Sequence, residues 1–156
     1  MANSVSQVLL TEDPLRDAAD PPSWNSGVAS TAGAVVDFWG VVRELEDARE
    51  IEGIDYEAHR AMAEHQMKLI ADAATEKFQL KRVLLHHRVG FVRAGEASLF
   101  LRVCAQHRAP AFEGSKWIVD ELKKKVPIWK RPAFGPSRTG TKATAGKSRL
   151  TGVTAK

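Results

Sequence analysis

Residues 60–78 read RAMAEHQMKLIADAATEKF, and the fold class follows from this stretch and its flanks. Its apolar positions recur at intervals of three and four residues, which is the spacing of one face of an amphipathic helix. The stripe consists of Ala63, Met67, Ile70, Ala74 and Phe78. We therefore predict a helix from Arg60 to Phe78.

Two strand-like segments precede this helix. Residues 33–43 begin with glycine and are rich in β-branched and aromatic residues, which predicts a strand partly covered on both faces. Residues 44–50 are a charged turn, and residues 51–58 alternate well enough to form a second, antiparallel strand. Residues 1–30 mix acids, prolines and small polar residues, so we interpret them as an N-terminal arm with room for one short strand.

After the helix, the sequence predicts a hairpin-like pair of strands and a second helix. Residues 81–89 and 97–105 are the strands, with a turn at 93–96 between them. Pro127 ends the second helix because proline lacks a backbone donor and clashes with the preceding turn. The apolar stripe of this helix is Ala111, Ser115, Ile118, Val119 and Leu122.

This order of elements predicts an α+β domain with a mainly antiparallel or mixed sheet and two principal helices. The chain has 156 residues, which is enough for one domain with a hydrophobic core. We place that domain at residues 31–134. Residues 135–156 consist mainly of Gly, Ser, Thr, Ala, Lys and Arg, and we expect a basic, flexible tail.

Composition excludes several classes of protein. No apolar run approaches the roughly 20 residues that a membrane-spanning helix needs, and the N-terminus has no secretory signal, so we expect a cytoplasmic protein. The single cysteine, Cys104, excludes an internal disulfide and a multi-thiolate zinc site. Because Cys104 lies within a strand-like run, we interpret it as a small buried hydrophobe rather than a nucleophile.

Cations gather in three separate segments. Residues 122–131 contain five cations around a proline and a tryptophan, with no acid. Residues 106–112 hold a second cluster at the start of the same predicted helix, and Arg43 follows the first strand. Together these segments predict one composite pocket for an anion.

Lys123 and Lys130 are the candidates for chemistry, because neighbouring cations lower the pKa of a lysine and make its neutral, reactive form accessible. Alternatively, Lys123 belongs to the solvated end of a helix, where cations complement the helix dipole. His107 and Arg108 stand where a strand leads into a helix, a position suited to a phosphate or carboxylate. His107 and Arg108 are equally consistent with an exposed pair at a helix start, and an isolated arginine such as Arg43 is more often a surface residue.

The remaining histidines give no metal-binding pattern. His86 and His87 adjoin in a strand and face opposite sides, while His59 and His65 lie on different faces of a helix. The sequence also lacks a glycine-rich phosphate loop and a Gly-x-Ser-x-Gly nucleophile turn. We expect neither a bound metal nor a cofactor.

The segments that carry the cations also occur together, in the same order, in one family. The chain resembles the large, catalytic subunit of molybdopterin synthase from about Gly33 to Arg131. The resemblance rests on the runs GAVVDFWGVVR at 33–43, HHRVG at 86–90, GE at 95–96, AQHRAPAF at 105–112 and LKKKVPIWK at 122–130.

The resemblance implies an α/β hammerhead-type fold and a homodimer. It implies a small ubiquitin-like partner subunit whose C-terminal Gly-Gly tail, charged as a thiocarboxylate, enters a pocket of this chain. Two sulfurs then pass to cyclic pyranopterin monophosphate (precursor Z) and form the dithiolene of molybdopterin. Carried over residue by residue, the resemblance makes Lys123 and Lys130 the functional lysines. It assigns substrate contact to Val41, Val42, Arg43, His107, Arg108, Lys123, Lys130 and Arg131.

The sequence departs from the family at Pro132, where an acid usually stands, and in the basic tail. Two other functions are compatible with the residues. The basic face and tail are suited to RNA or DNA, although the chain has a single tyrosine and no nucleic-acid motif. A non-catalytic scaffold is the other alternative, and the presence of both lysines argues against it.

Overall fold

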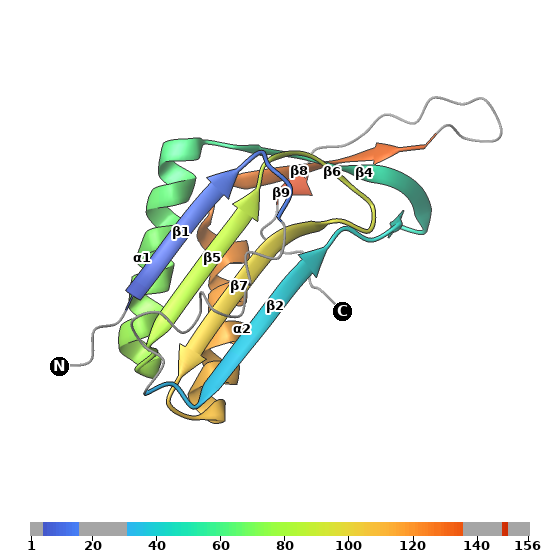
Figure 1. Ribbon diagram of the computed structural model, residues 1–156. Helices are drawn as coiled ribbons and strands as arrows, with labels where there is room; N and C mark the ends of the chain where they lie inside the picture. Colours follow the sequence, from blue (N-terminus) through green and yellow to red (C-terminus); the bar gives the residue numbers. More distant parts are fainter. Residues whose placement is uncertain (1–4, 16–30, 136–147, 150–156) are drawn as a thin grey trace.

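The computed structural model describes residues 5–15, 31–135 and 148–149, whose elements are arranged as two sheets and two helices (Figure 1). In chain order the elements are β1 (Val5–Thr11), β2 (Ala34–Val41), β3 (Leu45–Glu46), β4 (Arg49–Ala58), α1 (Arg60–Phe78), β5 (Arg82–Arg88), β6 (Gly90–Arg93), β7 (Ala97–Ala105), α2 (Arg108–Lys125), β8 (Ile128–Phe134) and β9 (Ser148–Arg149). The prediction of an α+β fold with a mixed sheet is confirmed.

The first sheet has the strand order β1-β5-β7-β2. β1 runs parallel to β5, whereas β5–β7 and β7–β2 are antiparallel. Every residue of β7 after Ala97 is buried, as expected for a strand with neighbours on both edges. The predicted strands at 33–43, 81–89 and 97–105 are thus confirmed as β2, β5 and β7. Cys104 is buried within β7, as predicted.

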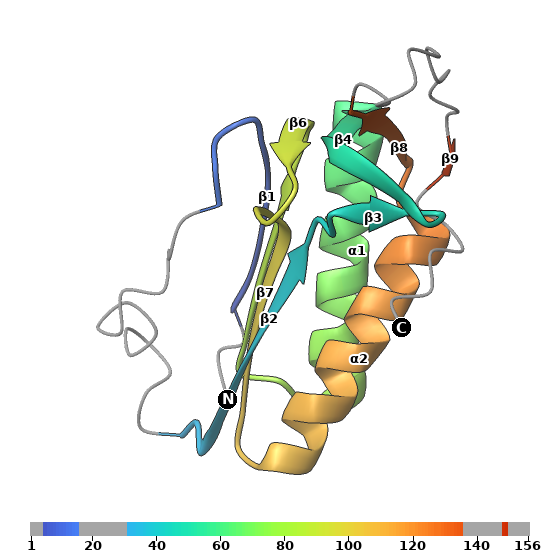
Figure 2. The same cartoon turned by 90° about the vertical axis from the view of Figure 1, so that its right-hand side faces the viewer.

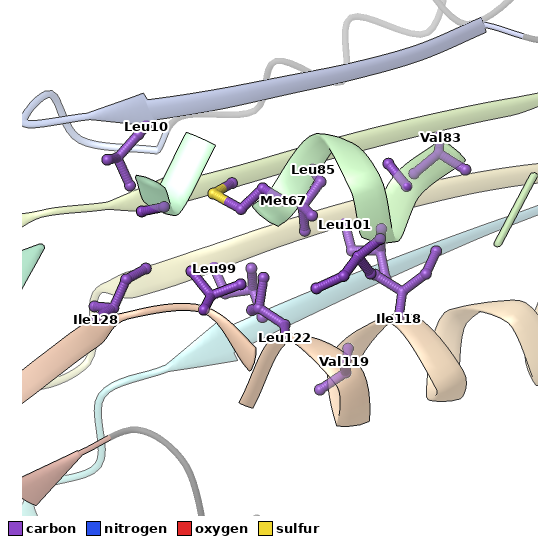
Figure 3. Close-up of a cluster of buried hydrophobic side chains, with 14 of the residues drawn as sticks. Leu10, Met67, Val83, Leu85, Leu99, Leu101, Ile118, Val119, Leu122 and Ile128 are labelled. Atoms are coloured by element: carbon purple, nitrogen blue, oxygen red, sulfur yellow. The ribbon is translucent and has the colours of Figure 1, made fainter. Parts of the chain in front are cut away.

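Both helices pack on the same face of the first sheet (Figure 2). α1 has the predicted bounds, and His59 caps its N-terminus: the His59 Nδ1 accepts a hydrogen bond from the Met62 N–H at 3.3 Å. The apolar stripes of α1 and α2 meet the sheet in one core, and Met67, Leu85, Leu101 and Ile118 belong to this single buried cluster (Figure 3). The residues buried on α2 are Ala111, Gly114, Ser115, Ile118, Val119 and Leu122.

The second sheet is built around β4, which pairs antiparallel with β3, β6 and β8. The sequence predicted β4 as an antiparallel strand but predicted neither β6 nor β8. Pro127 does end α2, and the chain then continues directly into β8. Of these two strands, β8 matters more for the site. Side chains alternate between the two faces of a strand, so the β8 conformation fixes the direction of the Lys130 side chain.

The terminal segments are described only in part. Within the expected arm, β1 is an edge strand of the first sheet, and Lys68 of α1 donates a hydrogen bond to the Ser6 carbonyl at 3.0 Å. Of the expected tail, β9 pairs with β8 at Trp129 and Lys130. Residues 16–30, 136–147 and 150–156 lie outside the described residues, so the proposed domain limits remain a prediction. No described helix is both long and apolar enough to cross a membrane.

Candidate functional site

A cavity of about 320 Å³ lies where the first sheet, the second sheet and the C-terminal end of α2 meet. Val41, Val42 and Arg43 reach it from the end of β2, Lys123 from the last turn of α2, and Lys130 from β8. The structure thus brings together five of the predicted site residues from three distant segments. The cavity is also lined by Phe38, Trp39, Gly40, Glu46, Ile54, Tyr56, His87, Ser98, Leu99 and Leu122.

A larger hollow of about 810 Å³ lies between β1, α1 and the start of β5. Its polar lining includes Ser6, Lys68 and Asp72, which bond to one another and thereby tie β1 to α1. None of the predicted site residues lines it. We therefore take the smaller cavity as the candidate site. There, charged side chains from the end of β2, from α2 and from β8 point into the same space.

Lys130 is the most deeply buried of the cations in this cavity, with 4% of its surface exposed. Its register on β8, opposite Tyr56 of β4, turns its side chain inward. The Lys130 Nζ donates to Glu46 Oε1 at 2.7 Å, which joins residues 84 positions apart. A buried ammonium requires such a partner, because removing a charge from water is costly.

Lys123 lies beside Lys130 in the cavity wall, and its side chain is partly shielded from solvent. Burial lowers the pKa of the Lys123 ammonium below its ordinary value, and the charges of Lys130 and Arg43 lower it further, against an opposing effect of Asp120. The neighbours Lys124 and Lys125 instead have exposed side chains that pair with Glu121. The alternative interpretation, a solvated helix end, therefore holds for Lys124 and Lys125 but not for Lys123.

Arg43 lies at the mouth of the cavity. Its side chain is 59% exposed, and its guanidinium is 4.0 Å from Glu46 Oε2. Glu46 therefore lies between Arg43 and Lys130. The sequence analysis did not identify Glu46, because nothing in its local pattern marks it out from the other acids of residues 44–50.

Three further polar residues of the cavity wall, Tyr56, His87 and Ser98, were also not predicted from the sequence. The Tyr56 hydroxyl donates to Ser98 Oγ at 3.3 Å, and burial is the main cause of a raised Tyr56 pKa. The ring of Tyr56 meets His87 edge to face, with centroids 5.5 Å apart. Burial lowers the pKa of His87 to about 4, so His87 is neutral at pH 7. Its Nδ1–H donates to the Arg88 carbonyl at 2.8 Å.

His107 and Arg108 lie at the other end of α2. Lys123 is sixteen residues further along this helix, which separates the two positions by about 24 Å at 1.5 Å per residue. The single pocket predicted from the sequence therefore does not include His107 and Arg108 of the same chain. The predicted helix itself implied this separation, since both clusters had been assigned to its opposite ends.

Arg131 also lies apart from the cavity. It follows Lys130 on β8, so its side chain leaves the opposite face of the strand. There its guanidinium is 3.2 Å from Glu57 Oε1. Recognising residues 128–134 as a strand would have separated Arg131 from Lys130 at the outset.

No group of three or more His, Cys, Asp or Glu side chains suited to a metal ion occurs among the described residues. His86 and His87 do face opposite sides of β5, as predicted, and His87 is the buried one. Burial raises the pKa of the Cys104 thiol, which disfavours the reactive thiolate. The charged groups available at the cavity are two lysines, an arginine and a carboxylate.

Comparison with known proteins places this fold and these motifs among relatives. The family model described as MoaE protein matches residues 12–125. The molybdopterin synthase catalytic subunit of Pyrococcus abyssi is 42% identical over 103 residues, 66% of this chain and 70% of that protein. The corresponding subunit of Oryza sativa subsp. indica is 40% identical over 103 residues, but the match spans just 53% of its length.

Solved structures agree on the fold. The crystal structure of molybdopterin synthase from Staphylococcus aureus superposes with a TM-score of 0.75 at 24% identity, covering 89% of this chain and 94% of that one. A complex of subunits 1 and 2 of molybdopterin-converting factor from Helicobacter pylori gives a TM-score of 0.64 at 20% identity, covering 85% and 91%.

Proposed function

This chain belongs to the MoaE protein family, and from that premise we propose that it is the catalytic subunit of molybdopterin synthase. In this proposal the protein is a sulfurtransferase of molybdenum cofactor biosynthesis. It converts cyclic pyranopterin monophosphate (precursor Z) into molybdopterin. The two sulfurs come from the C-terminal thiocarboxylate of a small ubiquitin-like partner subunit.

The observation that carries the proposal is the convergence of Arg43, Lys123 and Lys130 on one cavity. Three cations and the Glu46 carboxylate give the lining a formal charge of +2, since His87 is neutral at pH 7. Both reactants are anions, because the substrate carries a phosphate and the partner tail ends in a thiocarboxylate. A partly enclosed cationic cavity is suited to hold them together.

Sulfur transfer from a thiocarboxylate requires that its carbon–sulfur bond be broken after the sulfur has bonded to the substrate. If water attacks the acyl carbon, its oxygen stays on the tail as a carboxylate and the sulfur stays on the substrate. The attack passes through a tetrahedral oxyanion, which nearby ammonium groups stabilise. We assign this role to Lys130, which is buried and fixed by its bond to Glu46.

Lys123 is suited to a different role. Its lowered pKa makes the neutral amine accessible at a lower pH than for an ordinary lysine. A neutral amine accepts a proton from the attacking water, or itself attacks the acyl carbon and forms a transient adduct. Both routes need the amine near the partner tail, and both leave Lys123 indispensable.

His107 and Arg108 remain proposed substrate contacts, but their distance from Lys123 restricts how they act. These residues can reach a cavity from a second copy of the chain, because a twofold-symmetric interface sets residue i of each protomer against residue j of the other. We therefore include a homodimer in the proposal, with His107 and Arg108 of one protomer completing the site of the other. Arg131, which faces away from the cavity, is not assigned to it.

The proposed partner is a separate small subunit. The Helicobacter pylori relative of this fold is a complex of two different subunits, which supports such an assembly here. The side chains of Val41 and Arg43 are exposed to solvent at the mouth of the cavity, so an extended C-terminal tail can enter the cavity there. The cytoplasmic location expected from the sequence is retained as part of the proposal.

The test is reconstitution. The purified chain is mixed with thiocarboxylated small subunit and precursor Z, and molybdopterin is measured over time. We expect product from the wild-type chain, and losses of about a hundredfold or more for Lys123→Ala and about tenfold or more for Lys130→Ala. No product from a folded wild-type chain that binds the small subunit would overturn the proposal and leave a scaffold. Salt-sensitive binding of RNA or DNA in place of the small subunit would favour the nucleic-acid alternative.

A further inference from the structure

A carboxylate in the wall of an anion-binding cavity is unexpected, because it repels the ligands that the neighbouring cations attract. Glu46 is such a carboxylate, and its side chain is only 15% exposed. One carboxylate oxygen accepts from Lys130 Nζ at 2.7 Å, and the other lies 4.0 Å from the Arg43 guanidinium. Glu46 therefore contacts two of the three cations on which the proposed function depends.

The backbone around Glu46 is held in a narrow range of conformations. Glu46 of β3 pairs with Arg49 of β4, and the two-residue turn between them has positive φ at both positions, 50° at Asp47 and 61° at Ala48. A left-handed conformation is unfavourable for alanine. Such a turn matches the twist of the two strands, so the hairpin presents Glu46 to β8 in one direction.

A lysine side chain has four flexible methylene groups and no preferred direction of its own. In a cavity with two other cations, an unpaired Lys130 ammonium would be repelled by its neighbours. The short bond to Glu46 removes that freedom before any substrate binds. Groups that are already oriented toward developing charge stabilise a transition state better than groups that must first reorganise.

We propose that Glu46 is a positioning residue, which holds the Lys130 ammonium, and secondarily Arg43, in the geometry needed for sulfur transfer. This inference rests on the proposed function. It also divides the work between the two lysines. Lys130 is a fixed positive charge, and Lys123, which bonds to no carboxylate among the described residues, is the lysine that exchanges protons or bonds.

The key variants are Glu46→Gln, which keeps the shape but removes the charge, and Glu46→Asp, which keeps the charge. Glu44→Gln is the matched control, since Glu44 is an exposed acid two residues away. In the reconstituted reaction we expect Glu46→Gln to lower kcat about tenfold, Glu46→Asp to recover part of that loss, and Glu44→Gln to match the wild type.

Two further readouts separate positioning from a structural or purely electrostatic role. Removing a negative charge from the cavity leaves KM for precursor Z unchanged or lowers it, so the loss falls on kcat. If Glu46 acts through Lys130, Glu46→Gln has little further effect in a Lys130→Ala background. Thermal unfolding and small-subunit binding are measured for each variant, and Glu46→Asp carries the test if Glu46→Gln does not fold.

Several results would overturn the inference while leaving the proposed function intact. These are a wild-type kcat in folded Glu46→Gln, an equal loss from Glu46→Gln with and without Lys130, and a Glu46→Asp kcat no higher than that of Glu46→Gln. If Glu46→Gln does not fold, an equal loss of kcat from Glu46→Asp with and without Lys130 has the same meaning. A wild-type chain without activity would instead remove the proposed function and this inference together.

Discussion

The two ends of α2 have similar residues in opposite surroundings. At the C-terminal end, Lys123 is partly desolvated in a cavity that it shares with Lys130 and Arg43. At the N-terminal end, His107 and Arg108 are exposed to solvent. The difference supports the proposal that a cluster of cations becomes suited to chemistry through the enclosure that other strands supply.

In the proposed homodimer, the two ends would also differ in how far they depend on the second chain. The cavity at the C-terminal end is complete enough within one chain to orient two lysines and a carboxylate. At the N-terminal end, His107 and Arg108 line neither the 320 Å³ cavity nor the 810 Å³ hollow. The predictions below test this contrast, beginning with the largest expected change in free energy.

The largest expected effect concerns the histidines at the two ends. His87 lines the cavity with a pKa of about 4, whereas the unfolded chain binds that proton near pH 6.5. Stability is therefore present above pH 6.5 and is lost as the pH falls toward 4, by about 3 kcal/mol in all. Urea unfolding at pH 7 and pH 4.5 should show that His87→Gln removes most of this loss. His107→Gln is the control, and an unchanged pH dependence in His87→Gln would contradict the burial.

The next effect tests whether the two ends cooperate across a dimer. We expect Arg108→Ala to lower molybdopterin formation about tenfold, because it removes a charged contact to the substrate. Mixed dimers that pair an Arg108→Ala protomer with a Lys123→Ala protomer contain one site with neither change. Isolated with two affinity tags, they should recover about half of the wild-type activity. Mixed dimers no more active than the two parents would restrict each site to one chain.

A smaller effect distinguishes Lys123 from its neighbour Lys124. The rate at which each amine reacts with an acylating reagent is followed against pH by mass spectrometry. The midpoint for Lys123 should lie below the ordinary lysine value of 10.5, and Arg43→Gln should raise it by removing a nearby cation. Lys124, exposed on the same turn, is the internal reference. A Lys123 midpoint equal to that of Lys124 would mean that Lys123 is fully solvated in solution.

The smallest effect is expected at Arg131. Its side chain faces away from the cavity and forms a partly exposed ion pair with Glu57. Exposed ion pairs contribute little to the free energy of unfolding, so Arg131→Ala should leave that free energy nearly unchanged. It should change the rate of molybdopterin formation by less than about twofold. A tenfold loss of rate with normal folding would show that Arg131 contacts substrate from the outer face of β8.

Much of the fold was predictable from local pattern. The 3.6-residue period identified α1 and the buried stripe of α2, and the apolar content of residues 97–105 identified β7. β8 was not predictable in this way, because Lys130, Arg131 and Pro132 are all unusual in a strand. It forms because β4 provides a partner, which is a tertiary effect.

The site was predictable in its residue types but not in its geometry. Lys123 and Lys130 were identified because no acid lies among residues 122–131, and Arg43 because it follows an apolar strand. Glu46 was not predicted, because its partner Lys130 is 84 residues away in sequence and only the fold brings the two side chains to within 2.7 Å. His107 and Arg108 were grouped with the lysines by charge alone, although one helix length separates them.

The most direct test of the central claim compares two adjacent lysines in one assay. Molybdopterin formation is measured in single-turnover reactions with Lys123→Ala and Lys124→Ala, each saturated with thiocarboxylated small subunit and precursor Z. We predict a loss of about a hundredfold or more for Lys123→Ala, and a rate within about twofold of wild type for Lys124→Ala. Equal rates for the two variants would contradict the claim that enclosure in the cavity makes Lys123 the reactive lysine.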